Sequence, residues 1–426
     1  MSVQGKRLLL LGGTPLMCHV VLKAKEMGVY TIVTDYYDTN KAPAKIIADE
    51  AYDISTLDVD ALIELAKDRR ADGVFTGYSD ITLVPCRKVC DALGFPFYAT
   101  LDQLEQTLNK RKFKACCRAH GIRVVDDVDP EWISDQPEKI QFPVIVKPAD
   151  SYSSKGISVC HDVRSLREAV NKALFFSSCK EIVVEEYISA DDIYMYFTVQ
   201  NGVLSLSAMA DRLLNDEQFG VAPQPVGYFF PSRYIDKYFE QLHGNLQQMV
   251  KNLGLKNGTF FIQGFVIDGV IMVFEMGLRL SGGAGYLLIT HQNGIDPVKM
   301  HINYALTGSF SGWDVKSDDN PYFENPHCVV VVLLRNGTIG KIDGWSSVKT
   351  HPAVFETIQL LREGDVLNQA GTLNQVFARI YMSAENRADL KKAIREVQTA
   401  LDIKDDTNKN MILNSFNIQD AFSSKS

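Results

Sequence analysis

The chain has 426 residues, of which 46% are hydrophobic and 23% are charged. This balance is ordinary for globular proteins, and at about 150 residues per domain the length predicts two or three domains. The 44 basic residues are outnumbered by 52 acidic ones, and the net charge of −8 argues against nonspecific binding to nucleic acid or to anionic membranes. No apolar run approaches the roughly 20 residues of a membrane span, and the short N-terminal run is too brief for a secretory signal. We therefore expect a cytoplasmic protein with no membrane and no nucleic-acid partner.

The 8 cysteines are scattered along the chain. None forms a Cys-x-x-Cys pair with a matching pair of cysteines or histidines downstream, so a zinc or redox motif is not indicated. We expect reduced thiols, most of them in the core.

The first hundred residues alternate short apolar runs with helical patterns. Strands are predicted at Leu8–Leu11, Tyr30–Thr34 and Gly73–Thr76, and helices at Cys18–Met27 and Asp60–Asp68. Such alternation indicates a parallel sheet with helices on its faces, and therefore an α/β domain over residues 1–101.

Gly12 and Gly13, followed by Asp35, invite a dinucleotide-binding interpretation, because an acidic residue about 20 positions after a glycine turn can hold a ribose. The fingerprint is incomplete, since G-x-G-x-x-G is lacking and Pro15 interrupts the turn. A structural strand-to-helix turn is the favoured interpretation. The P-loop motif is also missing from the sequence, so a nucleotide would have to bind in another way.

The pattern changes after Asp102. A helix is predicted at Leu104–His120, followed by a strand at Pro143–Pro148, a Ser/Gly-rich loop at Ser151–Gly156 and a strand at Ile157–Cys160. The capping box Ser165-x-x-Glu168 predicts the start of the next helix. A strand is predicted at Glu181–Ile188, with Tyr194–Val199 and Ser205–Ala210 as its antiparallel partners.

Further along, Thr259–Ile267 and Val270–Glu275 are predicted to form a hairpin around Asp268-Gly269. Asp296 and Pro297 are typical of a helix start. Beyond Phe310 the predicted elements are strands at Val329–Leu334 and Thr338–Ile342 and an amphipathic helix that carries Leu390, Ile394, Val397 and Leu401 on one face.

Four short segments carry candidate chemistry, in this order. They are Asn109-Lys110 at a helix start, the strand Phe142–Pro148 that ends on Lys147, the run Glu185–Ile188 followed by Asp191-Asp192, and Glu275-x-x-x-Arg279 followed by Ser281-Gly282-Gly283. Each segment alone is weak evidence, because a strand-end lysine is usually solvated and a Glu-x-x-x-Arg pair is usually a salt bridge.

Together, in this order and spacing, the segments resemble the ATP-grasp superfamily, whose members include biotin carboxylase, the carbamoyl phosphate synthase large subunit, the formate-dependent glycinamide ribonucleotide transformylase and the L-amino acid ligases. The resemblance covers nearly the whole chain. It implies a mixed α/β and α+β fold: a Rossmann-like α/β domain over residues 1–101, an ATP-grasp domain of two α+β subdomains over 102–307, with its lid at about 140–200, and a small β-rich α+β domain over 308–426.

The resemblance also implies an ATP site. Lys110 and Lys147 match the lysines that contact the phosphates, as suits a nucleotide with close to four negative charges. The loop that carries Ser153, Ser154 and Gly156 matches the lid loop over the phosphates. Backbone groups in the segment Glu185, Glu186, Tyr187 and Ile188 match the adenine hinge, and Asp192, with Asp191 as the fallback, matches the carboxylate on the ribose.

The metal site departs from the family pattern. Members usually hold Mg²⁺ with two carboxylates and an asparagine. Glu275 matches the second carboxylate, whereas Gln263 stands at the first and Gly277 at the asparagine. A neutral amide oxygen can bind Mg²⁺ but contributes less charge. The implied cofactors are ATP and Mg²⁺, with Mn²⁺ as an alternative ion.

Arg279 matches the arginine near the transferred phosphate, and Arg212, Ser281, Gly282 and Gly283 are weaker substrate candidates. The expected function is an ATP-dependent ligase that joins a small-molecule carboxylate to an amine through an acyl phosphate, with release of ADP and phosphate. The alternatives are carboxyphosphate chemistry like that of carbamoyl phosphate synthase and a non-catalytic ATP-binding module. Family analogy favours a homodimer.

Overall fold

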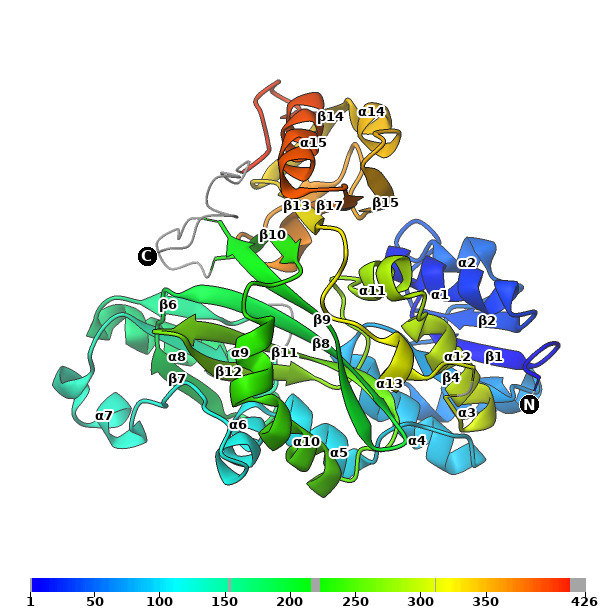
Figure 1. Ribbon diagram of the computed structural model, residues 1–426, viewed down its shortest axis with the longest axis horizontal. Helices are drawn as coiled ribbons and strands as arrows, with labels where there is room; N and C mark the ends of the chain where they lie inside the picture. The colour runs from blue at the N-terminus through cyan, green and yellow to red at the C-terminus, as the bar shows by residue number, and fades with distance from the viewer. Residues whose placement is uncertain (1, 152–154, 216–222, 311, 414–426) are drawn as a thin grey trace.

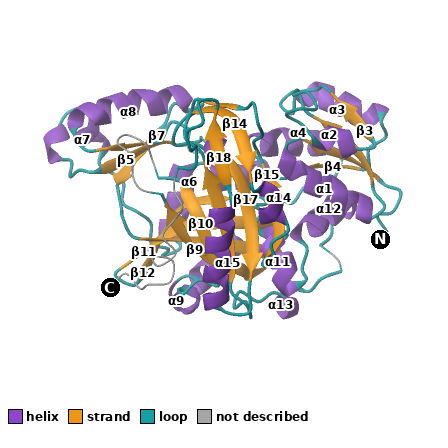
Figure 2. Ribbon diagram, turned by 90° about the horizontal axis from the view of Figure 1, so that it is seen from above, coloured by secondary structure: helices purple, strands orange, loops and turns teal. Residues whose placement is uncertain are grey.

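The computed structural model of the chain describes residues 2–151, 155–215, 223–310 and 312–413. Its core is a large antiparallel sheet with smaller units around it (Figures 1 and 2). The N-terminal α/β unit lies at one end of the molecule, and a small sheet with α7 and α8 lies at the opposite end. The C-terminal strands and helices lie at the top of Figure 1, and three of these strands belong to the large sheet.

The N-terminal unit is a four-stranded parallel sheet in the order β3-β2-β1-β4, as the alternating pattern predicts. Leu8 and Leu10 pack in one buried cluster and Leu9 and Leu11 in another, so the two faces of β1 are both covered. The strands are β1 (Arg7–Leu11), β2 (Tyr30–Thr34), β3 (Glu50–Tyr52) and β4 (Gly73–Thr76), and the helices are α1 (Pro15–Glu26), α2 (Ala44–Ile47), α3 (Val59–Asp68) and α4 (Leu83–Leu93).

The glycine turn after β1 uses Asp35 to fix its own backbone. The Asp35 carboxylate accepts the Gly13 N–H at 2.8 Å and the Tyr37 N–H at 3.0 Å. A Cβ atom on Gly13 would come within 2.6 Å of the Ala42 Cβ, so the glycine is required by close packing. These contacts support the structural interpretation of the turn over a ribose site.

The predicted helix Leu104–His120 is wrong as a single element. The chain forms α5 (Leu101–Leu108) and α6 (Lys110–Ala119), with Asn109 between them in an extended conformation. The Asn109 side chain accepts the N–H groups of Arg111 and Lys112 and so caps α6. This cap makes Lys110 the first residue of a helix.

The large sheet has eight strands in the order β12-β11-β8-β9-β10-β13-β17-β15, and all the pairings are antiparallel. The predicted hairpin around Asp268-Gly269 is confirmed as β11 and β12. The strands are β8 (Asp191–Gln200), β9 (Val203–Leu214), β10 (Pro225–Phe230), β11 (Gly258–Ile267), β12 (Val270–Gly277), β13 (His327–Leu333), β15 (Val354–Gln359) and β17 (Val376–Ser383).

A second, smaller sheet has the order β6-β5-β7 and packs on α8. Its strands are β5 (Val144–Pro148), β6 (Ser158–Cys160) and β7 (Ile182–Glu186), and the helices beside it are α7 (Pro130–Ser134) and α8 (Val163–Phe176). The predicted pairing of Glu181–Ile188 with Tyr194–Val199 is wrong, because β7 pairs with β5 while β8 and β9 pair with each other. The predicted helix start is also shifted, since Asp162 is the N-cap of α8 and Ser165 is the other partner of its capping box.

The two predicted strands beyond Phe310 belong to different sheets. Val329–Leu334 falls on β13 of the large sheet, whereas Thr338–Ile342 falls on β14 of a three-stranded sheet in the order β16-β14-β18. The elements of this sheet and the two helices beside it are β14 (Gly337–Asp343), β16 (Val366–Leu367), β18 (Asp402–Asp405), α14 (Trp345–Lys349) and α15 (Arg387–Ala400). The predicted apolar face of α15 is confirmed, because Leu390, Ile394 and Val397 are buried.

The remaining helices cover the large sheet and join it to the N-terminal unit. They are α9 (Ile235–Gln241), α10 (His243–Asn252), α11 (Tyr286–Asn293), α12 (Pro297–Thr307) and α13 (Val315–Asp318). Asp296 caps α12 and Pro297 is its first residue, as predicted. Within the described ranges the structure has no helix that is both long and apolar enough to cross a membrane.

His301, on α12, is a buried histidine at the junction between the N-terminal unit and the large sheet. Its ring stacks on Phe75 of β4 at 5.6 Å, and its Nε2 atom is 2.8 Å from the Thr259 hydroxyl of β11. Burial lowers the pKa of His301 from 6.5 to about 3, so the imidazole is neutral in the folded protein.

This histidine predicts a loss of stability in mild acid. Below pH 6.5 the unfolded chain protonates His301 while the folded chain does not, so each pH unit from about 6.5 toward 3 costs about 1.4 kcal/mol of unfolding free energy. In His301→Gln, the slope of the unfolding free energy against pH between pH 6 and 5, measured by urea denaturation, should be smaller by about that amount. An unchanged slope would contradict the neutral buried state.

Candidate active site

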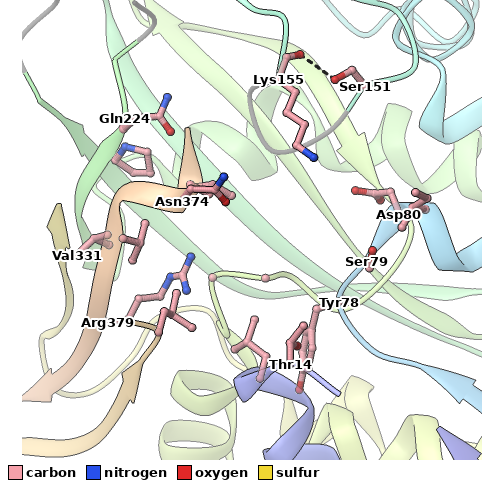
Figure 3. A pocket seen from close by; sticks show the side chains of 18 of the residues that line it. Thr14, Tyr78, Ser79, Asp80, Ser151, Lys155, Gln224, Val331, Asn374 and Arg379 are labelled. Carbon is pink, nitrogen blue, oxygen red and sulfur yellow. Dashed lines mark hydrogen bonds between the residues drawn. The ribbon is translucent and has the colours of Figure 1, made fainter. Parts of the chain in front are cut away.

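A cavity of about 1200 Å³ opens where the N-terminal unit, the small sheet and the large sheet meet (Figure 3). Residues of all three parts line it. The N-terminal unit contributes Thr14, Tyr78 and Asp80, and the small sheet with the segment after β7 contributes Ile145, Lys147 and Ile188. The large sheet with the segment after β12 contributes Arg212, Glu275, Arg279 and Arg379. The four segments singled out in the sequence therefore converge on one cavity.

Lys110 reaches this cavity from the first turn of α6. Its side chain is 8% exposed, and its Nζ atom donates to the Ser151 carbonyl at 2.8 Å and lies 3.5 Å from Glu275 Oε1. The Lys110 N–H donates to the Ala149 carbonyl at 3.0 Å, so the start of α6 is tied to the strand that carries Lys147. The ammonium group has only a long contact to a carboxylate and faces the cavity.

Lys147 is held by a buried carboxylate that also holds a second lysine. Glu185 is 2% exposed, and its two carboxylate oxygens accept from Lys147 Nζ and Lys114 Nζ, each at 2.6 Å. Burial alone would raise the pKa of Glu185, but the two ammonium groups outweigh this effect and lower it. The Lys147 ammonium also sits 4.9 Å above the Phe274 ring. Sequence reasoning missed Lys114 and missed this role of the Glu185 side chain.

The segment after β7 provides an apolar wall. Tyr187 and Ile188 line the cavity together with Ile145, and the Tyr187 N–H donates to the Pro143 carbonyl at 3.0 Å. The Glu186 side chain is exposed. Of the four residues expected at the adenine hinge, Tyr187 and Ile188 therefore line the cavity, whereas Glu185 and Glu186 are not among its lining residues.

The loop over this wall is described only in part. Ser153 and Ser154 lie outside the described residues. The Ser151 hydroxyl donates to the Lys155 carbonyl at 2.8 Å (Figure 3). Gly156 has φ +79°, and a Cβ atom there would come within 2.8 Å of Pro148 and 3.0 Å of Phe176, so this glycine is required by packing against β5 and α8.

Asp192 and Gln263 are both engaged by Arg212. The guanidinium donates to the two Asp192 oxygens at 2.7 and 2.6 Å and to the Gln263 amide oxygen at 2.6 Å. All three side chains line the cavity. Arg212 therefore holds the residue expected on the ribose and the residue expected on the metal, a coupling that the sequence does not reveal.

Glu275 is the carboxylate expected at the metal position, and it lines the cavity. It lies opposite Gln263 in the register of β11 and β12, and its side chain is 31% exposed. Gly277 lies opposite Phe261, and a Cβ atom there would come within 2.3 Å of the Phe261 ring. An asparagine therefore cannot fit at position 277 beside this ring.

The donor set for a divalent cation is correspondingly small. Within the described ranges, no group of three or more His, Cys, Asp or Glu side chains could hold a metal ion. Glu275 fits a magnesium ligand, and the Gln263 oxygen fits one only in competition with Arg212.

Arg279 is fixed by a residue that sequence reasoning missed. Its Nε atom donates to Asp80 Oδ1 at 2.7 Å, its other terminal nitrogens bond to Asp80 Oδ2 and to the Leu280 carbonyl, and its guanidinium lies 5.1 Å above the Phe261 ring. Asp80 follows β4 of the N-terminal unit. No local motif marks it, because its partner is 199 positions away.

The Ser281–Gly283 segment contributes backbone rather than a hydroxyl. The Ser281 hydroxyl is buried, bonded to the Tyr194 hydroxyl at 2.9 Å and accepting the Gly283 N–H at 3.2 Å. Gly282 and Gly283 line the cavity. The Tyr381 hydroxyl donates to the Gly283 carbonyl at 3.0 Å and so ties this turn to β17.

Comparison with protein families and curated sequences gives consistent matches. The model of the family described as "D-ala D-ala ligase C-terminus" matches residues 108–219. The formate-dependent phosphoribosylglycinamide formyltransferase of Sulfurovum sp. is 24% identical over 75% of this chain and 84% of that protein. The enzyme of the same name from Sulfolobus acidocaldarius is 29% identical, but the match spans 44% of this chain and only 48% of that protein.

Solved structures match over nearly the whole chain. An L-amino acid ligase from Bacillus licheniformis has a TM-score of 0.78 at 18% identity and covers 94% of this chain and 99% of its own. The biotin carboxylase domain of the Hydrogenobacter thermophilus 2-oxoglutarate carboxylase, solved with MgADP and bicarbonate, has a TM-score of 0.74 at 17% identity and covers 95% and 91%. At these identities the likeness concerns the fold.

The close contact at Gly277 predicts a steric effect on stability. Gly277→Ala should lower the free energy of unfolding by about 1–3 kcal/mol, because the added methyl group collides with the Phe261 ring. Gly282→Ala is the matched control, since the nearest atom to its Cβ position is 4.0 Å away. Equal denaturation midpoints for the two variants would contradict the packing argument.

Proposed function

We propose that this chain, whose fold is that of the ATP-grasp ligases, joins a small-molecule carboxylate to an amine with conversion of ATP to ADP and phosphate. The observation that carries the proposal is the convergence of Lys110, Lys147, Glu275 and Arg279, from separate segments, on one cavity. One fold neighbour is named an L-amino acid ligase, another was solved in complex with MgADP, and the relatives include formate-dependent formyltransferases, which supports the same chemistry.

The proposed reaction has two steps. A carboxylate oxygen of the first substrate attacks the γ-phosphorus of ATP, the bond from phosphorus to the β,γ-bridging oxygen breaks, and ADP leaves with the electron pair. The acyl phosphate that results is attacked at its carbonyl carbon by the amine, which loses a proton as inorganic phosphate departs and the amide forms. The protein contributes positioning and charge stabilisation in both steps.

The residues of the cavity have distinct parts in this scheme. Lys110 and Lys147 reach the phosphates from α6 and β5, and Tyr187 and Ile188 hold the adenine beside the β7 edge. Arg279, kept in place by Asp80, faces the transferred phosphoryl group and the charge that develops on it. Gly282 and Gly283 supply backbone N–H groups near the same charge.

Magnesium, or manganese in its place, would be held by Glu275 together with phosphate oxygens and would neutralise charge on the phosphates. Asp192 and Arg212 act as a pair, so we propose that Asp192 supports the site through Arg212 rather than by a direct bond to the ribose.

The same proposal covers the wider organisation. We propose a division at residues 1–101, 102–307 and 308–426, with the lid at about 140–200, a cytoplasmic location and a homodimer. The fold neighbour from Hydrogenobacter thermophilus is described as a dimer.

A second candidate function is a non-catalytic ATP-binding module. Two observations favour it. The Gln263 amide oxygen is hydrogen-bonded to Arg212, and the Phe261 ring leaves no room for a side chain at position 277. Its distinguishing property would be ATP binding without release of ADP in the presence of any acid and amine.

Lys110 provides the first test. Lys110→Met should raise the Kd for ATP at least about tenfold, because a charge-assisted contact to phosphate is lost. Lys112→Met is the matched control, since Lys112 lies on the same helix, its side chain is 42% exposed, and it pairs with Glu105 of α5. The two Kd values are measured by isothermal titration calorimetry. An unchanged Kd in Lys110→Met would remove Lys110 from the phosphate site.

The metal position provides the second test. Glu275→Gln should raise the Mg²⁺ concentration needed for half-maximal ADP release about tenfold or more. Gln263→Glu should leave turnover near the wild-type rate, because Arg212 pairs with the new carboxylate. A large gain of ATP turnover in Gln263→Glu would instead support the non-catalytic candidate and a lost metal ligand.

A further inference from the structure

Arg379 is a buried arginine that has no hydrogen-bond or ion-pair partner among the described residues. It lies on β17 between Val331 of β13 and Ile358 of β15 and is 7% exposed. Its NH1 atom is buried and makes no hydrogen bond. Within the described ranges its guanidinium forms no ion pair either, although it lines the cavity and projects into it in Figure 3.

Three other buried cations of the cavity form short ion pairs, and a fourth, Lys110, lies 3.5 Å from Glu275. Arg212 bonds to Asp192, Arg279 to Asp80 and Lys147 to Glu185. An unpaired charge out of water is strongly unfavourable, so proteins pair such groups or bring a ligand to them. Arg379 breaks this pattern and therefore indicates an anion that arrives from the cavity.

The surroundings of Arg379 restrict what that anion can be. Gln224 and Asn374 lie on the same side of the cavity as Arg379 in Figure 3 and are neutral, and Val331, opposite Arg379 in the register of β13 and β17, adds aliphatic surface. Tyr228 and Val376 also line the cavity. One positive charge among neutral and apolar groups matches one negative charge. A carboxylate fits this description, whereas a phosphate group carries close to two charges at neutral pH.

The position of Arg379 separates it from the phosphate end of the cavity. In Figure 3 it lies on the opposite side from Asp80, the partner of Arg279, and from Lys155 of the lid loop. A carboxylate held at Arg379 is therefore not the one that would be phosphorylated beside Arg279.

We propose that Arg379 binds the free carboxylate of the amine substrate, and that this substrate is an amino acid with an apolar side chain placed against Val331 and Val376. The carboxylate site follows from Arg379 itself. Its assignment to the amine substrate rests on the proposed ligase function.

The binding test uses L-leucine, L-leucinamide and inorganic phosphate as probes of the full chain, with and without MgADP. L-Leucine should raise the Tm of the wild-type protein and of Arg395→Gln, a variant at an exposed arginine on α15, but not of Arg379→Gln. Leucinamide, which lacks the carboxylate, should raise none. The site is refuted by any of four results: no leucine shift in the wild type, an equal leucine shift in Arg379→Gln, an equal shift with leucinamide, or a phosphate shift that exceeds the leucine shift and is lost in Arg379→Gln.

The stability of the ligand-free protein is the second readout. Arg379→Met removes a buried charge without a partner and should raise the Tm, the reverse of the effect of deleting a structural arginine. A lower Tm in Arg379→Met would contradict the proposal. If leucine binds as described but no acid and amine pair releases ADP, the carboxylate site stands and the ligase function fails.

Discussion

A single buried carboxylate, Glu185, joins the elements that carry Lys110 and Lys147, at the end of the cavity proposed to hold the phosphates. It accepts from Lys114 on α6 and from Lys147 on β5, so one acidic group ties the helix in the body of the protein to the small sheet. Lys110 lies one helical turn before Lys114 and is carried by the same helix. Both contacts measure 2.6 Å and the carboxylate is almost completely buried, so these two charge pairs help to set the positions of Lys110 and Lys147 relative to each other.

Charge pairing also explains how the remaining walls are assembled. Asp80 brings the N-terminal unit to Arg279, and Asp192 keeps Arg212 over Gln263. Each pair satisfies a group that would be costly to bury alone. The same requirement limits the proposed metal position. The Gln263 amide oxygen accepts a hydrogen bond from Arg212, and this bond competes with coordination of a cation. The cavity thus holds the cationic groups predicted from the sequence, and Glu275 is the carboxylate at the proposed metal position.

Local signals in the sequence predict the fold well and the cavity in part. The hairpin at Asp268-Gly269 and the helix start at Asp296-Pro297 are set by nearest neighbours, and both are confirmed. The pairing of β7 and the separation of β13 from β14 depend on which sheet buries each strand, and the pattern of one strand does not contain that information. Asp80 was missed for the same reason, whereas Arg379 left a usable signal: a charged residue inside the apolar run Val376–Met382.

The large sheet runs without a break from β12 to β15, and it joins strands from before and after residue 308 through the pair β10 and β13. The C-terminal strands therefore close a sheet whose β10 would otherwise be an edge. A protein shortened before β13 would present the backbone of Val226–Phe230, with its aromatic side chains, to other molecules, and such edges promote aggregation. Continuity of this kind also resists hinge motion between the two regions. Among the described residues the small sheet shares no strand pairing with the large one, so opening and closing of the cavity would fall to the small sheet.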